Sequence, residues 1–280
     1  MLRSPTRRVL AHLAVALLSC SPIPAQQKTL APPEFASWLP ITPSELQMKS
    51  PAVDPNAGAE VLVWRVHVVD ELLSNNDLQR VLYHYVRLKI FDEKGVEKAA
   101  TIDLTYGDRT AILEVSGRTV KADGSIVELD RKTVYKRDLV RAGGRKLKAV
   151  SFAMPGVEPG AIVEYRWEER QDDNRIMYFR MHFQRKFPVE RVTYFVKPLP
   201  SRFTGGYGMY LNPYNCRTSP LKEENDGYTS TYVESVPASR DEPFSPSEPN
   251  ISPWALLHYQ MGERRDPDKY RADLGRNTAG

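Results

Sequence analysis

Apolar and polar residues alternate along much of the chain, and this pattern predicts β-strands. In the segment from Glu60 to Val69, the side chains of Leu62, Trp64 and Val66 share one face. The segment from Val81 to Phe91 alternates in the same way. Because successive side chains of a strand point to opposite faces, a period of two is typical of a strand with one face in a core. We expect these two segments to pair.

Turn signals separate the further strand candidates. Asp92-Glu93-Lys94-Gly95 predicts a turn, and Asp123-Gly124 is a hairpin signal because both residues accept the backbone angles of a tight turn. Thr133 to Val140 fits either one helical turn or another strand. Short strands at such spacing predict an all-β fold, either an antiparallel β-sandwich or an open barrel. The remaining candidates are Ala99 to Tyr106, Thr110 to Ser116, Arg118 to Lys121, Ser125 to Leu129, Met177 to Phe187, Val189 to Val196, Gly205 to Leu211 and Tyr228 to Val236.

The segment from Phe152 to Trp167 is the stretch around which the other strands are expected to be arranged. It contains two turn signals, Pro155-Gly156 and Pro159-Gly160, followed by a strongly alternating run. Proline fixes φ and glycine accepts a positive φ, so two such pairs favour a stiff reversal of the chain. The pattern therefore predicts a hairpin at one corner of the sheet, with a ligand-binding loop as the alternative.

Residues 1–25 have the layout of a secretory signal peptide. Basic residues precede the apolar run from Val9 to Leu18, and small residues follow up to Ala25. The leader predicts export to the periplasm or the medium, with no membrane span after cleavage. Leu17 to Cys20 also resembles a lipobox, which would make Cys20 the lipidated first residue of an outer-membrane lipoprotein. A third alternative is a twin-arginine signal at Arg7-Arg8.

The rest of the chain divides by composition into three parts. Residues 26–58 are rich in proline, alanine and serine and predict a flexible tether that docks locally through Phe35 and Trp38. Residues 59–236 are the predicted β-sandwich-like domain. Residues 237–280 predict a proline-rich linker and the start of a following, truncated domain, because Asp266-Pro267 opens a short helical pattern that ends at Gly275.

Charge and cysteine content narrow the classes of function. The chain has 39 basic and 35 acidic residues, and three of its arginines lie in the leader, so the mature chain is nearly neutral and nucleic acid is not an expected partner. The basic run from Arg141 to Lys148 is interpreted as a solvated loop. The two cysteines are Cys20 and Cys216, and processing of the leader removes Cys20 from pairing, so no internal disulfide is expected.

The sequence contains no motif of a phosphate loop, a zinc site of paired cysteines or a metalloprotease helix. We therefore expect no catalytic, cofactor-binding or metal-binding residues and no cofactor. Gly205-Gly206-Tyr207-Gly208 fits a hairpin loop better than a phosphate loop. Cys216 would need a base beside it to act as a nucleophile, and the sequence does not supply one. Single histidines are interpreted as half-buried structural residues. They are His67, His84 and His182 on predicted strands, and His258 after the proline-rich segment.

Acidic pairs and aromatic strand faces are the remaining candidate sites. Glu168-Glu169 and Asp172-Asp173 fit the two carboxylates of a glycosidase poorly, because adjacent strand residues point to opposite faces. Tyr83 and Tyr85 share one strand face, and so do Tyr178, Arg180 and His182. Such faces stack sugars or receive a partner domain, although packing in the core is the more common use of aromatic side chains.

Three segments resemble a known family, the domain of unknown function 3857 family. They are VLYHYVRLKIFDEKG (Val81 to Gly95), RTVKADGSIVEL (Arg118 to Leu129) and FAMPGVEPGAIVEYRW (Phe152 to Trp167), and the resemblance continues to about Pro253. This family is a β-rich domain at the N-terminus of exported bacterial proteins, ahead of a transglutaminase-like domain. The resemblance implies a transglutaminase-like partner downstream or in trans. No position here matches the cysteine motif of that partner's Cys-His-Asp triad, so no catalytic residue is carried over.

Two hypotheses follow from these observations. In the first, the chain is a non-catalytic accessory domain of an exported transglutaminase-like protein. In the second, it is a free-standing module that binds a glycan or a peptide of the cell envelope. An enzyme in its own right is the third reading, and it would need His67, His84 or His182 to cluster with a carboxylate.

Overall fold

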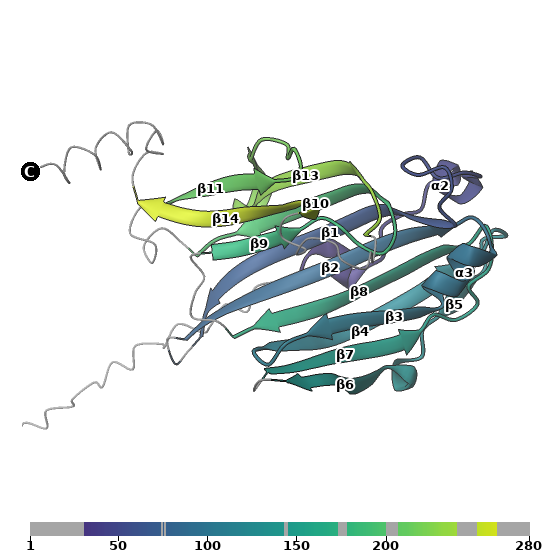
Figure 1. Ribbon diagram of the computed structural model, residues 1–280, viewed down its shortest axis with the longest axis horizontal. Coiled ribbons are helices and arrows are strands. Elements are labelled where there is room, and N and C mark those ends of the chain that lie inside the picture. Colours follow the sequence, from purple (N-terminus) through teal and green to yellow (C-terminus); the bar gives the residue numbers. More distant parts are fainter. Residues whose placement is uncertain are drawn as a thin grey trace, which may run out of the picture.

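The computed structural model describes residues 31–73, 75, 77–142, 145–172, 178–199, 207–239 and 251–261. Strands dominate this part of the chain and form three sheets (Figure 1). Among the described residues no sheet closes into a barrel, because each has two edge strands. The all-β prediction is therefore confirmed, in its sandwich form.

The large sheet, sheet A, has eight strands, and two smaller sheets have three strands each. Sheet A contains β1 (Ala59–Leu72), β2 (Leu78–Ile90), β4 (Thr110–Val120), β5 (Ile126–Glu128), β8 (Ile162–Gln171), β10 (Val189–Lys197), β12 (Lys222–Glu223) and β13 (Thr229–Val236). Sheet B contains β3 (Thr101–Tyr106), β6 (Tyr135–Ala142) and β7 (Arg145–Ala153), and sheet C contains β9 (Tyr178–His182), β11 (Tyr207–Tyr214) and β14 (Trp254–Met261). The helices are α1 (Pro33–Ala36), α2 (Pro43–Gln47) and α3 (Glu93–Ala99), with short 3-10 turns at Arg131–Thr133 and Asn225–Gly227.

Sheet A runs in the order β12-β13-β10-β1-β2-β8-β4-β5. The predicted pairing of the first two strands is confirmed, with Trp64 of β1 opposite Val86 of β2. On its other edge, β1 pairs in parallel with β10, and Val61 lies opposite Val189. This parallel pair departs from the fully antiparallel expectation. It arises because the chain passes through β9 of sheet C before it returns to sheet A, and so enters β10 in the same direction as β1.

Sheets B and C pack on the same face of sheet A and share one hydrophobic core with it. Phe152 of β7 contacts Tyr165 of β8, with ring centres 6.1 Å apart, and Phe179 of β9 lies 6.1 Å from Tyr194 of β10. In Figure 1, sheet C lies near β10 and β13, whereas sheet B lies near β4. The alternation predicted for the strands is thus explained by burial of one face of sheet A beneath both smaller sheets.

The opposite face of sheet A carries residues 33–58, which we call the strap. Its docking through Phe35 and Trp38 is as predicted: their rings lie 5.0 Å from Tyr83 and 6.3 Å from Tyr85. The strap is fixed at many further points, including Glu60, whose carboxylate accepts hydrogen bonds from two strap amides. From residue 33 onward, the predicted flexible tether is therefore a docked element of the fold.

The hairpin predicted at Phe152 to Trp167 is wrong. The two flanking strands form, but β7 belongs to sheet B, and β8 pairs with β2 and β4 of sheet A. Residues 154–161 thus carry the chain from one layer to the other. Gly156 and Gly160 do adopt positive φ, at 63° and 88°, as a stiff reversal requires. The sequence indicated the turn, but not which strands it joins.

Asp92 to Gly95 forms the start of a helix, α3, where we predicted a turn. The Asp92 side chain caps the helix by accepting a hydrogen bond from the Gly95 amide at 2.9 Å. Gly95 lies inside the helix because it packs against Gly58: a Cβ at position 95 would lie 1.9 Å from the Gly58 carbonyl oxygen. The glycine therefore serves a close approach of two backbones and does not end the element.

Strand β14 was missed, because it lies in the segment predicted as linker and following domain. Ala255 and Leu257 are buried in the shared core, and Leu257 pairs with Leu211 of β11 and Phe179 of β9. The β-rich unit therefore extends beyond the predicted boundary at residue 236. The helix predicted at Asp266 to Gly275 lies outside the described residues, and the helices that the structure describes near a chain end are α1 and α2, toward the N-terminus.

Two further strand predictions are refined. Thr110 to Ser116 and Arg118 to Lys121 are parts of the single strand β4, which has an irregularity between Leu113 and Ser116. The undecided segment from Thr133 to Val140 is largely strand β6.

The predicted signal peptide, including Cys20, lies outside the described residues. Among the residues that the structure does describe, no helix has the length and apolar character needed to cross a membrane.

Candidate functional site

A buried ionic network lies between sheet A and the strap. Its centre is Glu164 of β8, whose side chain has no exposed surface. Glu164 accepts hydrogen bonds from Arg87 Nε at 2.9 Å and Arg118 Nε at 2.7 Å, and a short one from the Tyr85 hydroxyl. Burial and the charge of Glu164 hold the pKa of Tyr85 far above its usual value, so its hydroxyl stays protonated and donates.

Strand register explains why these side chains meet. Arg87 of β2 and Arg118 of β4 both lie directly opposite Glu164, one on each side of β8. Tyr85 precedes Arg87 by two residues and so shares its face. All of these residues were visible in the sequence, but the network was not predicted, because polar residues on one strand face suggest a solvent-exposed face. The strap covers that face, and its role became clear only from the structure.

A second polar cluster lies on the core face of sheet A. His84 of β2 stacks on Trp167 of β8, with ring centres 4.2 Å apart, and its Nε2 atom is 3.4 Å from a carboxylate oxygen of Glu169. The Arg185 guanidinium lies 3.9 Å above the Trp64 ring. Burial lowers the pKa of His84, so the ring is neutral at pH 7. A neutral histidine stacked in a core fits the structural role predicted for it.

His67 lies on the strap side, against Glu34 of α1. Its Nδ1 atom is 3.3 Å from the Glu34 carboxylate, and its ring stacks on Phe195 at 4.4 Å. Burial lowers the pKa of His67 to about 4, although the Glu34 charge acts in the opposite direction. The structure thus brings two of the predicted histidines, His67 and His84, close to carboxylates, but on opposite faces of one sheet, so they do not form a common site.

Sheet C exposes an aromatic and basic outer face. The predicted face of Tyr178, Arg180 and His182 is confirmed by an alternating burial pattern along β9. Beside it, Trp254 of β14 stacks on Tyr214 of β11, with ring centres 4.1 Å apart, and the Arg180 guanidinium lies 4.3 Å above Trp254. His258 lies on the same face, with its ring 5.9 Å from Tyr210. Tyr178 and Tyr214 are 64% and 42% exposed. Flat aromatic rings beside a guanidinium are suited to stacking a sugar or a planar group of a peptide.

Cys216 follows β11 and is half-buried. Its sulfur lies 3.7 Å from the carbonyl oxygen of Trp254, and burial raises the pKa of the thiol. A catalytic thiol needs a lowered pKa, since the thiolate is the nucleophile. The environment of Cys216 is therefore that of a packing residue.

The two carboxylates of the Glu168-Glu169 pair lie on opposite faces of β8, as predicted. Glu168 bonds to Arg170 on the strap face of β8, whereas Glu169 lies beside His84 on the core face. Asp172 accepts a hydrogen bond from Gln79 at 2.6 Å. Asp173 lies outside the described residues, as do Gly205 and Gly206 and the side chains of Arg141 to Lys146.

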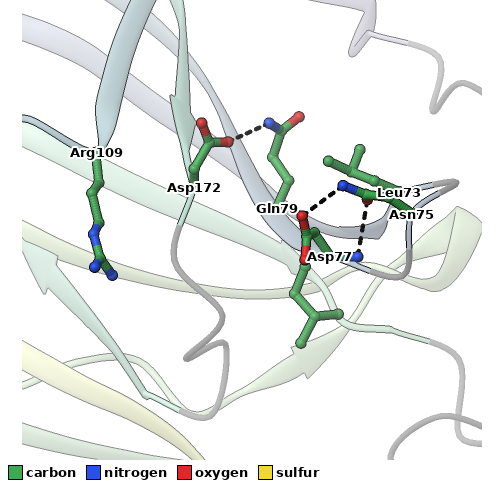
Figure 2. Close-up of a pocket in the computed structure, with 7 residues that line it drawn as sticks. Leu73, Asn75, Asp77, Gln79, Arg109 and Asp172 are labelled. Carbon is green, nitrogen blue, oxygen red and sulfur yellow. Dashed lines mark hydrogen bonds between the residues drawn. The ribbon is translucent and has the colours of Figure 1, made fainter.

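An open hollow of about 500 Å³ borders the connection between β1 and β2. Its polar side chains bond to one another, as Gln79 does to Asp172 and Asn75 does to Asp77 at 2.6 Å (Figure 2). Arg109 stands apart from both pairs in Figure 2. The hollow therefore offers polar walls for solvent or a small polar group, and its two carboxylates are each held by an amide. It is lined by Leu73, Asn75, Asp77, Leu78, Gln79, Arg109 and Asp172.

The sheets and clusters define a β-sandwich module whose buried charges hold its own segments together and whose outer sheet face is aromatic. A family model described as a domain of unknown function with a solved structure, DUF3857, matches residues 76–238, which is more than half of the chain. The chain therefore belongs to the DUF3857 family, and the resemblance seen in the sequence is confirmed. Among curated proteins, none matches the chain.

Comparison with solved structures matches this chain to parts of longer chains. A proposed protease of Parabacteroides distasonis is similar with a TM-score of 0.54 and 20% identity, over 72% of this chain and 40% of that one. A proposed nutrient-binding protein of Legionella pneumophila has a TM-score of 0.33 and 8% identity, over 71% and 67% of the two chains. An M1 zinc metallopeptidase of Deinococcus radiodurans has a TM-score of 0.32 and 10% identity, over 74% and 44%. At 20% identity, the similarity to the Parabacteroides distasonis protein concerns the fold alone. The matched region is less than half of that protein.

Proposed function

We propose that the chain is a non-catalytic accessory domain of an exported bacterial transglutaminase-like protein. The family match over residues 76–238 carries this proposal, because the family resemblance implies such a neighbour. Three observations support it. The charged groups that the fold brings together bond to one another, and the thiol of Cys216 has its pKa raised by burial. In addition, the similar region of the proposed protease from Parabacteroides distasonis is less than half of a longer chain.

An activity assay tests the non-catalytic part of this proposal. The purified chain is incubated with a glutamine-containing peptide and a primary amine, and separately with amide substrates. We expect no turnover above buffer, and the same result for Cys216→Ala. Turnover that Cys216→Ala abolishes would show that the chain is itself an enzyme.

The DNA sequence that follows and surrounds the coding region tests the accessory role. We expect the reading frame after codon 280, or an adjacent gene, to encode a domain with a Cys-His-Asp triad. If it does, co-expression of the two parts should yield a complex that remains together on gel filtration. A gene neighbourhood without such a domain contradicts the accessory role.

We further propose that residues 1–25 direct export, so that the mature protein resides in the periplasm or the medium. The basic and apolar pattern of the leader supports this. Fractionation of a bacterial host and N-terminal sequencing of the product test it. A mature chain that begins at Gln26 indicates simple cleavage, lipidated Cys20 indicates a lipoprotein, and an uncleaved cytoplasmic product refutes export.

The outer face of sheet C favours a second candidate function, the binding of an envelope glycan or peptide. The observation behind it is the exposed Tyr178 beside the stacked pair of Trp254 and Tyr214. Envelope glycans and peptides are titrated against the full chain, Tyr178→Ala and Tyr214→Ala. Tyr135→Ala is the matched control, since Tyr135 is 54% exposed but lies on sheet B. Binding that only the sheet C variants weaken supports this candidate, and no binding at millimolar concentration rejects it.

A further inference from the structure

Four hydrogen bonds hold the strap through its main-chain oxygens. Arg166 Nη1 donates to the Glu34 carbonyl at 2.8 Å. Arg87 donates to the carbonyls of Leu39 at 2.7 Å and Pro40 at 3.1 Å, and Lys89 Nζ donates to that of Leu46 at 2.7 Å. Leu39 and Pro40 lie between the two short helices, whereas Glu34 and Leu46 belong to α1 and α2. Every polypeptide carries such carbonyls, so these bonds recognise a main chain and not a particular sequence.

Two aromatic side chains of the strap supply the sequence-specific contacts. Phe35 meets Tyr83 edge to face at 5.0 Å. Trp38, three residues later, lies beneath two guanidinium groups, those of Arg166 at 4.3 Å and Arg118 at 4.9 Å. Aromatic rings set against cations and other rings are the typical anchors of a peptide in its binding site.

The face beneath the strap is organised independently of it. Glu164 is bonded by Tyr85, Arg87 Nε and Arg118 Nε, all of them groups of sheet A. The terminal nitrogens of Arg87 and the ammonium of Lys89 donate toward the strap. Arg87 Nη2 also contacts Tyr85 and Glu164, and Lys89 Nζ also donates to the Gly160 carbonyl. The described part of the strap contributes no strand to sheet A, so its departure breaks no bond of the β-ladder.

Charge also matches between the two surfaces. On β2, β4 and β8 this face presents Arg87, Lys89, Arg118, Arg166 and Arg170 against the carboxylates of Glu164 and Glu168, and so carries an excess of positive charge. The strap contains three carboxylates, Glu34, Glu45 and Asp54, and one lysine, Lys49. Glu45 lies 2.7 Å from Arg87, and Glu34 lies 3.7 Å from Arg65 of β1. A peptide with net negative charge is thus the occupant that this face fits.

We propose that the face of sheet A formed by β2, β8 and β4 is a peptide-binding surface, which the strap occupies in cis. When the strap leaves, the surface takes an acidic peptide with two aromatic side chains three residues apart, followed by proline, as in Phe35-Ala36-Ser37-Trp38-Leu39-Pro40. This goes beyond the accessory function, because it assigns to the domain a recognition site of its own. The docked strap keeps the site closed, since a tethered segment acts at an effective concentration on the order of millimolar.

Binding of a fluorescent peptide with the sequence of residues 31–48 tests the proposal on the full chain. The double variant Phe35→Ala, Trp38→Ala loosens the strap and should bind the peptide at least about tenfold more tightly than the wild type, whose own strap competes. A peptide with both aromatic residues replaced by alanine should not bind. Adding Arg166→Ala to the double variant should weaken binding, whereas adding Tyr135→Ala should not. If the folded double variant does not bind at about 1 mM peptide, or binds both peptides equally, the proposal is overturned.

Hydrogen exchange of the wild type keeps the proposal testable if the double variant fails to fold. The amides of Ser37 and Leu46 bond within the strap, to Pro33 and Thr42. If the strap leaves by itself, these amides exchange at least about tenfold faster than the ladder amides of β2, through a local opening. Equal protection of both sets would mean that the strap leaves only when the whole domain unfolds, and would refute a displaceable strap.

Discussion

Glu164 is a fully buried charge that the fold retains at the centre of its sheet. Removing a carboxylate from water is costly, and hydrogen bonds from Arg87, Arg118 and Tyr85 offset that cost. The arginines depend on Glu164 in turn, because both lie within hydrogen-bond distance of it and are largely buried. Loss of one of these side chains therefore leaves the others with fewer hydrogen bonds in a buried site.

Glu164→Gln should lower the free energy of unfolding by about 3–5 kcal/mol, because Arg118 loses its carboxylate partner and the buried Arg87 keeps only Glu45. Urea denaturation at pH 7 measures this. The control is Glu234→Gln, which removes the partner of Arg191 in a pair whose side chains are about half exposed, and should cost at most about 1 kcal/mol. Equal effects of the two substitutions would contradict the importance assigned to burial.

His67 makes stability depend on pH. Its pKa is about 4 in the fold and 6.5 ordinarily, so the unfolded chain binds the proton more readily. Its stabilising contribution is present above pH 6.5 and is lost as the pH falls toward 4. Over that range His67 accounts for a loss of up to about 3 kcal/mol, even though the Glu34 carboxylate faces it, because burial outweighs that attraction.

His67→Gln should therefore flatten the fall in stability between pH 6.5 and pH 4, when the free energy of unfolding is measured at several pH values for both proteins. Carboxylates elsewhere contribute equally to the stability curves of both proteins, so the difference between the two curves gives the contribution of His67. Parallel curves would show that His67 does not titrate with the folding transition.

At the scale of elements, the sequence predicted individual strands better than their partners. Trp64 and Val66 show the alternation of β1 because one face of that strand is buried in a single core. Strand β14 was missed because it is recognisable only beside β9 and β11, which come from distant parts of the chain. The ionic network was missed for the same reason: Arg87, Arg118 and Glu164 meet through register, and register is a property of pairs of strands.

The connection between β7 and β8 depends on glycine at position 160. Gly160 has a φ of 88°, its amide bonds to Ile90, and an added Cβ would meet only an ordinary contact, 3.5 Å from Ala122. Gly160→Ala should therefore cost about 1–2 kcal/mol through backbone strain alone. Gly107→Ala is the control, because open space surrounds that position and its φ is not in the left-handed region. Thermal unfolding of both variants measures the difference, and equal melting temperatures would refute the strain.

The three sheets form one unit at the scale of the molecule, since they share a core. Phe152→Ala in sheet B should cost about 3–5 kcal/mol and Leu257→Ala in sheet C about 2–5 kcal/mol, because both side chains are fully buried. Each should shift one cooperative transition that tryptophan fluorescence and far-UV circular dichroism report identically. Leu256→Ala is the control, on the outer face of the same strand. Two separate transitions in either variant would show that the sheets unfold independently.

The parallel pairing of Val61 with Val189 joins two neighbouring strands of sheet A, β1 and β10, that lie far apart in the order of synthesis. β1 leaves the ribosome long before β10 exists, and until then one of its edges has no partner. Folding thus has to wait for a contact between distant parts of the chain, and such contacts make folding slow. A nascent chain that ends before residue 189 presents an open strand edge, which is the form of the protein most exposed to aggregation and most in need of a chaperone.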